Sequence, residues 1–113
     1  MAINVKSAGN STPIIKTAAS VGTTCTQIRA DIGATVTILA SGAIYIFNDV
    51  AEGGSVPAAA SRFELSADEA SQGIKITVGR AFISGRVARR KVGGTICIAA
   101  TTGTVSVRII AER

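Results

Sequence analysis

Short segments of alternating apolar and polar residues recur along this chain and constrain its fold more than any other feature. Successive side chains of a β-strand point to opposite faces, so this period of two is typical of strands that bury one face. The sequence therefore predicts an all-β, antiparallel protein. The pattern is clearest in five segments: TVTIL (35–39), AIYIF (43–47), GIKITVG (73–79), TICIA (95–99) and TVSVRII (104–110).

Weaker candidates for strands lie between and around these five segments, and turn-forming Gly, Ser, Asn and Asp separate them. The number and spacing of the segments predict a compact antiparallel sandwich or jelly-roll-like barrel of about eight to ten short strands. The weaker candidates are INVK (3–6), PIIKTA (13–18), TCTQIR (24–29), RFEL (62–65) and AFIS (81–84).

The connections between segments carry their own signals. Val92-Gly93-Gly94-Thr95 is typical of a two-residue hairpin, and Thr102-Gly103 of the next turn. They predict a three-strand meander from Arg86 to the C-terminus. The stretch at 48–61 has no strand pattern, and we expect a long loop that offers a contact surface.

One short helix is expected between two of the strands. In SADEASQG (66–73), Ser66 is placed as the N-cap, Glu69 follows three residues later, and Gly73 ends the segment. This is the spacing of a capping box followed by a glycine C-cap. The sequence predicts about one helical turn here.

Length and hydropathy set the expected organisation. A chain of 113 residues favours a single β domain over 1–113, in which 1–12 is an extended N-terminal arm. Hydrophobic residues make up 47% of the chain, which indicates surface that another subunit covers. The sequence has neither a long apolar run nor a secretory signal, so we expect synthesis and retention in a reducing cytoplasm.

The two cysteines and the absence of histidine limit the chemistry. In a reducing compartment Cys25 and Cys97 are best interpreted as small buried hydrophobes, although the sequence leaves a disulfide between them open. Histidine is the commonest general base and the commonest metal ligand, and the chain contains none. We expect no catalytic residues, no metal and no cofactor, and hence a protein that is not an enzyme.

Positive charge is concentrated in the last third of the sequence. Residues 1–69 carry four basic against six acidic residues, a net charge of −2, whereas residues 70–113 carry eight against one, a net charge of +7. The densest stretch is GRVARRKVGG (85–94), for which a strand is favoured over a marginal helix. The residues we expect to bind a partner are Arg80, Arg86, Arg89, Arg90 and Lys91.

Three interpretations of this basic stretch remain open. It is a solvated edge hairpin whose charges prevent aggregation, an arm that binds carboxylates of a protein partner, or a nucleic-acid contact. No aromatic residue interleaves with the arginines to stack bases, which weakens the third interpretation.

In overall style the chain resembles bacteriophage virion structural proteins, and capsid decoration or cement proteins in particular. The resemblance is carried by a small, His-free, Ala/Gly/Thr/Val-rich chain with segments such as SQGIKITVG and GTVSVRII. It implies a β-rich, commonly trimeric domain that sits on the outer capsid surface and bridges major capsid subunits. It implies no catalytic residues.

The expected function is therefore that of a non-enzymatic virion structural protein, a decoration or cement subunit that binds and stabilises the outer capsid surface. Its expected partner is the major capsid protein, its expected state a homo-oligomer with a trimer favoured, and its location the virion, with neither nucleic acid nor membrane as partner. Two alternatives remain: a small basic β-barrel that binds nucleic acid, and a receptor- or glycan-binding tail domain.

Overall fold

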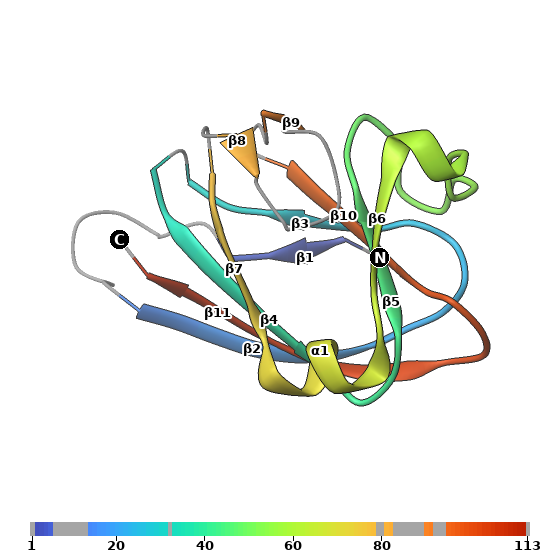
Figure 1. Ribbon diagram of the computed structural model, residues 1–113. Coiled ribbons are helices and arrows are strands. Elements are labelled where there is room, and N and C mark those ends of the chain that lie inside the picture. The colour runs from blue at the N-terminus through green and yellow to red at the C-terminus, as the bar shows by residue number, and fades with distance from the viewer. Residues whose placement is uncertain are drawn as a thin grey trace.

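Two antiparallel-rich sheets pack face to face in the computed structural model and form a sandwich rather than a closed barrel (Figure 1). The structure describes residues 2–5, 14–31, 33–78, 81–82, 90–91 and 95–112, of which 81–82 and 90–91 are described by their backbone alone. The all-β sandwich prediction is confirmed.

The five-stranded sheet has the order β1-β3-β10-β5-β6. Its one parallel pairing joins β1 to β3, and its other neighbours run antiparallel. Of the expected N-terminal arm, Ile3 and Asn4 thus belong to the sheet as β1, and residues 1 and 6–12 lie outside the described residues. The strands are β1 (Ile3–Asn4), β3 (Thr26–Arg29), β10 (Thr95–Ala100), β5 (Ile44–Phe47) and β6 (Arg62–Leu65).

The four-stranded sheet has the order β2-β11-β4-β7 and is antiparallel throughout. Its strands are β2 (Ile14–Val21), β11 (Val105–Glu112), β4 (Thr35–Ala40) and β7 (Ile74–Thr77). A separate two-stranded sheet pairs β8 (Ala81–Phe82) with β9 (Arg90–Lys91). All ten segments with strand character in the sequence contain or overlap a strand of the structure.

The pairing of the strands is that of a jelly roll. Four antiparallel pairs, β2 with β11, β3 with β10, β4 with β7 and β5 with β6, are shared out between the two sheets. An eight-stranded double sheet of this kind is the jelly-roll arrangement. To these eight strands the chain adds β1 at one sheet edge and the β8–β9 pair.

The predicted C-terminal meander is wrong. β10 lies in the five-stranded sheet between β3 and β5, β11 lies in the four-stranded sheet between β2 and β4, and β9 pairs with β8. The residues of β10 from Ile96 to Ala100 are buried on both faces, which requires a central position. The turn at Gly103, with φ of 61°, therefore carries the chain from one sheet to the other. The hairpin predicted at 92–95 falls mostly outside the described residues.

The predicted helix is confirmed as α1 (Ala67–Gln72), with Ser66 as N-cap and Gly73 as C-cap. The Ser66 hydroxyl accepts a hydrogen bond from the Glu69 N–H, and the Glu69 carboxylate accepts one from the Ser66 N–H. This capping box satisfies donors that the helix leaves free. A short 3₁₀ turn, η1 (Ala59–Ser61), precedes β6.

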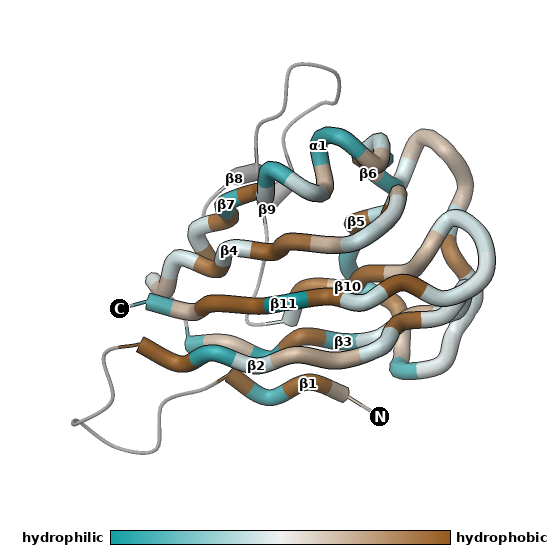
Figure 2. The backbone as a smooth tube through the Cα atoms, turned by 90° about the horizontal axis from the view of Figure 1, so that it is seen from below, coloured by the Kyte–Doolittle hydropathy of each residue, from teal (hydrophilic) through white to brown (hydrophobic). Residues whose placement is uncertain are grey.

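The core between the sheets is made of branched aliphatic side chains. The fully buried residues include Ile28, Ile38, Ile76, Ile98 and Ile109. Among the described residues no polar or charged side chain is buried. Buried residues alternate with more accessible ones along β4 and β11, and Figure 2 shows apolar and polar residues along these strands.

Candidate interaction surface

The sequence-predicted site lies mostly outside the described residues. Arg80, Arg86 and Arg89 are among the residues that the structure does not describe. Arg90 and Lys91 form β9, where they pair with Phe82 and Ala81 of β8. For these two residues the strand prediction is confirmed, and their role in binding a partner stays a prediction.

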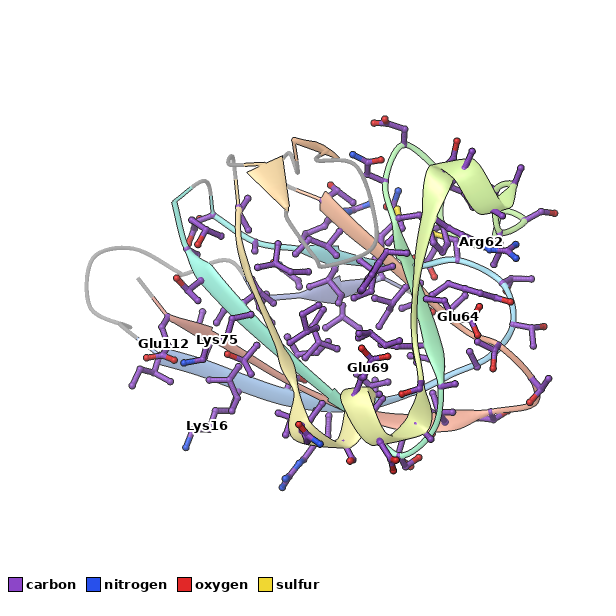
Figure 3. All side chains as sticks on the ribbon, in the orientation of Figure 1. Lys16, Arg62, Glu64, Glu69, Lys75 and Glu112 are labelled. Carbon is purple, nitrogen blue, oxygen red and sulfur yellow. The ribbon has the colours of Figure 1, made fainter. Side chains whose placement is uncertain are left out.

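A second basic surface, which the sequence did not single out, is the outer face of the four-stranded sheet. Register places Lys16 opposite Ile110, Ile110 opposite Thr37, and Thr37 opposite Lys75. These four side chains form one row across all four strands, with a lysine at each edge. In Figure 3, Lys16 and Lys75 lie at the same end of this sheet.

The neighbouring rows complete this surface. On one side Arg108 lies between Ala18 and Leu39. On the other side Glu112 lies between Ile14 and Thr35. We call the surface the open face and define it by the following residues: Ile14, Lys16, Ala18, Thr35, Thr37, Leu39, Lys75, Thr77, Arg108, Ile110 and Glu112.

The open face combines positive charge with accessible apolar surface. Lys16, Lys75 and Arg108 are exposed, against one exposed carboxylate at Glu112. Within the described parts of the chain no ion pair engages any of the three cations. Ile14 is 49% exposed and is the one large hydrophobic residue so exposed among those described. Such a surface suits a partner that offers carboxylates around a small apolar patch.

The outer face of the five-stranded sheet is, in contrast, covered by the chain itself. The loop that begins after β5 folds back over β10 and β3, and its Val50 and Val56 pack on Cys25, Cys97 and Phe47. Farther along, Arg62 stacks on the Tyr45 ring, 4.2 Å from the centroid, and donates to the Pro57 carbonyl oxygen at 3.1 Å. The segment 50–57, which we call the covering loop, thus closes this face.

Local conformation explains why these residues form the covering loop. Asp49 and Gly53 have positive φ, of 64° and 80°, and Asp and Gly tolerate that region best. The Gly54 N–H donates to the Ala51 carbonyl at 2.9 Å and closes a tight turn. A Cβ on Gly54 would come within 2.7 Å of a Val50 methyl carbon, so the turn requires glycine there.

The covering loop is tied to the end of β3 by backbone and side-chain hydrogen bonds. The Cys25 N–H donates to the Gly54 carbonyl, and the Gly53 N–H donates to the Cys25 carbonyl, both at 2.8 Å. The Gln27 N–H donates to the Glu52 carboxylate at 2.7 Å, and the Gln27 side-chain amide donates to the Val50 carbonyl at 2.8 Å. The predicted contact surface at 48–61 therefore has its inner side engaged with the protein's own sheet.

The carboxylate of Glu52 is adapted to this anchoring role. Partial burial alone would raise the pKa of Glu52. The hydrogen bond from the Gln27 N–H and nearby positive charge, Arg29 included, outweigh burial and hold the pKa below its usual value. The ionised form, which is the better acceptor for the Gln27 N–H, is therefore favoured.

Across the described ranges, no group of three or more His, Cys, Asp or Glu side chains is placed to hold a metal ion. No helix in the described part of the chain has the length and apolar character needed to cross a bilayer.

Comparison with protein-family models, curated proteins and solved structures finds no match to this chain.

Proposed function

We propose that the chain is a non-enzymatic structural subunit of a virion, which docks on the outer surface of a capsid and stabilises it. The observation that carries the proposal is the open face, where Lys16, Lys75 and Arg108 surround partly exposed apolar side chains. Jelly-roll double sheets occur in viral capsid proteins and in lectins, which supports this class by analogy of fold.

The chemistry of the open face favours an acidic protein surface as partner. The Arg108 guanidinium can bind a carboxylate through two parallel hydrogen bonds, and the lysines add point charges at the sheet edges. A single exposed ion pair contributes only about 0–1 kcal/mol. Repetition of the same weak contacts around a symmetric shell would multiply them into stable attachment.

A cement subunit must touch more than one neighbour, and the chain carries the basic stretch predicted from the sequence in addition to the open face. In Figure 1, β8 and β9 lie on the side of the molecule away from the open face, which Figure 2 shows from the front. We propose that the stretch Arg86 to Lys91, with Arg80, contacts one capsid subunit while the open face contacts another. The proposed partner is the major capsid protein.

A glycan-binding function, which the same fold has in lectins, has less support. Sugar-binding sites commonly present an aromatic ring for stacking, and Tyr45 is the one tyrosine in a chain without tryptophan. The guanidinium of Arg62 already occupies a face of that ring. We therefore prefer capsid docking to glycan binding.

The experiment uses virus particles from the genome that encodes the chain. Particles are purified with the coding sequence deleted, and wild-type protein or the triple variant K16A/K75A/R108A is added back. We expect wild type to bind in a fixed copy number per particle and to raise the temperature at which particles release their contents. Loss of the three cations should weaken binding at least tenfold, because each contributes a charge-assisted contact.

Two further proteins make this experiment specific. E64K changes an exposed charge on β6, away from the open face, and should bind like wild type. R86A/R89A/R90A removes the same number of positive charges as the first triple variant, from the predicted basic stretch, and should also weaken binding while leaving the fold intact. Particles that do not bind the wild-type protein would contradict the proposal.

A further inference from the structure

The two cysteines, far apart in sequence, share one hydrogen-bond acceptor beneath the covering loop. The Cys25 and Cys97 thiols both donate to the Val50 carbonyl oxygen, at Sγ–O distances of 3.7 and 3.5 Å. Both side chains are buried, and both are free thiols. Two thiols held on one oxygen are close neighbours in space.

Strand register explains this juxtaposition. Cys97 of β10 pairs with Gln27 of β3, and Cys25 lies two residues before Gln27, so the two cysteines are diagonal neighbours on one face. Cys25 precedes the first paired residue of β3, Thr26, so the ladder to β10 does not fix its backbone. Its backbone is held instead by Gly53 and Gly54 of the covering loop.

The closed covering loop keeps both thiols unreactive. Burial first, and then the neighbouring Cys97 thiol and Glu52 carboxylate, raise the pKa of Cys25 to about 12. Since the thiolate is the reactive form, a closed loop leaves almost no nucleophile at Cys25, and burial shields both sulfur atoms from an oxidant. An open loop would expose both sulfur atoms and at the same time release the backbone of Cys25 to approach Cys97.

We propose that Cys25 and Cys97 are a redox pair that a low-molecular-weight disulfide joins into an intramolecular disulfide bond, and that opening of the covering loop controls the reaction. A thiolate of one cysteine attacks the small disulfide, forms a mixed disulfide and releases one small thiol. The thiolate of the other cysteine then attacks the protein sulfur of the mixed disulfide and releases the second small thiol. The protein loses two electrons and two protons, and the small disulfide is reduced to two thiols.

The first test is made on wild-type protein with oxidised glutathione, followed by alkylation and intact-mass measurement. We expect the main product to have lost two hydrogen atoms, to resist alkylation at both cysteines, and to give one cross-linked peptide containing Cys25 and Cys97. Because the bond constrains the unfolded chain, the oxidised form should melt several degrees higher than the reduced form. Excess dithiothreitol should restore the mass, the alkylation and the melting temperature of the reduced protein.

The second test measures whether the covering loop controls access. Gln27→Ala removes the side-chain bond to the Val50 carbonyl, so the rate of thiol modification in the folded protein should rise several-fold. Ser66→Ala is the control, because it weakens the helix cap of α1 elsewhere in the fold. It should leave the rate close to that of wild type.

Several results would overturn the proposal. Glutathione adducts that never proceed to an internal disulfide would show that the sulfur atoms cannot meet. Covalent dimers as the main product would show that the cysteines pair between molecules rather than within one. Thiols that react only in denaturant would show that the covering loop does not open in the folded protein. Equal acceleration by Gln27→Ala and Ser66→Ala would show that the thiols react through general destabilisation rather than through opening of the covering loop.

Discussion

Individual residues explain why the two outer faces of the sandwich differ. Along β10, Cys97 and Ala99 point away from the core, and both are small and apolar. A loop can pack closely on such side chains. At the corresponding outward positions of β11 the chain places Ser106 and Arg108, which are exposed. One sheet is thereby covered by its own chain, and the other is left accessible.

The thiol of Cys25 should make the free energy of unfolding fall as pH rises into the alkaline range. The folded state holds its proton more tightly than the unfolded chain, where the pKa of cysteine is about 8.5. Its contribution to the free energy of unfolding is therefore complete below about pH 8.5 and is lost as pH rises toward about 12. Melting curves recorded under reducing conditions between pH 7.5 and 10.5 should show a steeper fall of Tm for wild type than for Cys25→Ala. Parallel curves for the two proteins would contradict this assignment.

At the scale of elements, the short helix α1 links the two sheets. It follows β6 of the five-stranded sheet, precedes β7 of the four-stranded sheet, and buries Ala70 in the core. A helix of six residues has little stability of its own, so its cap and its packing must hold it. The reciprocal bonds between Ser66 and Glu69 supply the cap.

Loss of that cap should be measurable in the whole protein. Ser66→Ala removes the acceptor for the Glu69 N–H and should lower the free energy of unfolding by about 1 kcal/mol. Ser71→Ala is the matched control, because the Ser71 hydroxyl only donates to a carbonyl within the helix. It should change stability by less than about 0.5 kcal/mol in urea titrations followed by circular dichroism. A Ser66→Ala protein as stable as wild type would show that packing alone holds α1.

The whole molecule carries a net charge of +5 and presents the basic open face. For a virion subunit this charge should attract an acidic protein shell without making the chain a general nucleic-acid binder. Phosphate contacts would give affinity that falls steeply with salt, whereas assembly through apolar surface would not.

Size-exclusion chromatography with light scattering separates these two behaviours. We expect a homo-oligomer, with a trimer favoured, of the same mass at low and high salt, and no shift on addition of duplex DNA. A monomer that binds DNA at low salt and releases it at high salt would contradict the virion proposal. That result would assign the basic residues to phosphate contacts.

Much of the fold could be predicted because period-two alternation records which face of each strand is buried. It therefore located β4, β5, β7, β10 and β11, and the Ser66–Glu69 spacing located α1. Alternation does not record which strand lies alongside, since β10 and β11 bury residues equally well in one sheet or in two. The meander prediction failed for that reason.

The candidate surface shows the same limit. The sequence placed Lys75 on the polar face of its strand, but only register across β2, β11, β4 and β7 brings Lys16 and Lys75 into one row. The close spacing of arginines in the sequence was the stronger signal, and it favoured Arg86, Arg89 and Arg90 as the partner-binding residues instead. The sequence could not predict that Cys25 and Cys97 share the Val50 carbonyl oxygen as acceptor, because this depends on how the covering loop folds back.

The pairing of β2 with β11 has a consequence for how the protein is made. Ile14 lies opposite Glu112 and Val21 opposite Val105, so the first long strand meets its neighbour only in a segment far away in the sequence. A nascent chain in which β11 has not yet been made has no partner for β2 on that side. Contacts so distant in sequence make folding slow, and they leave strand edges exposed in the meantime. The four-stranded sheet can therefore be completed only after β11 has been synthesised, and until then aggregation and chaperone capture compete with folding.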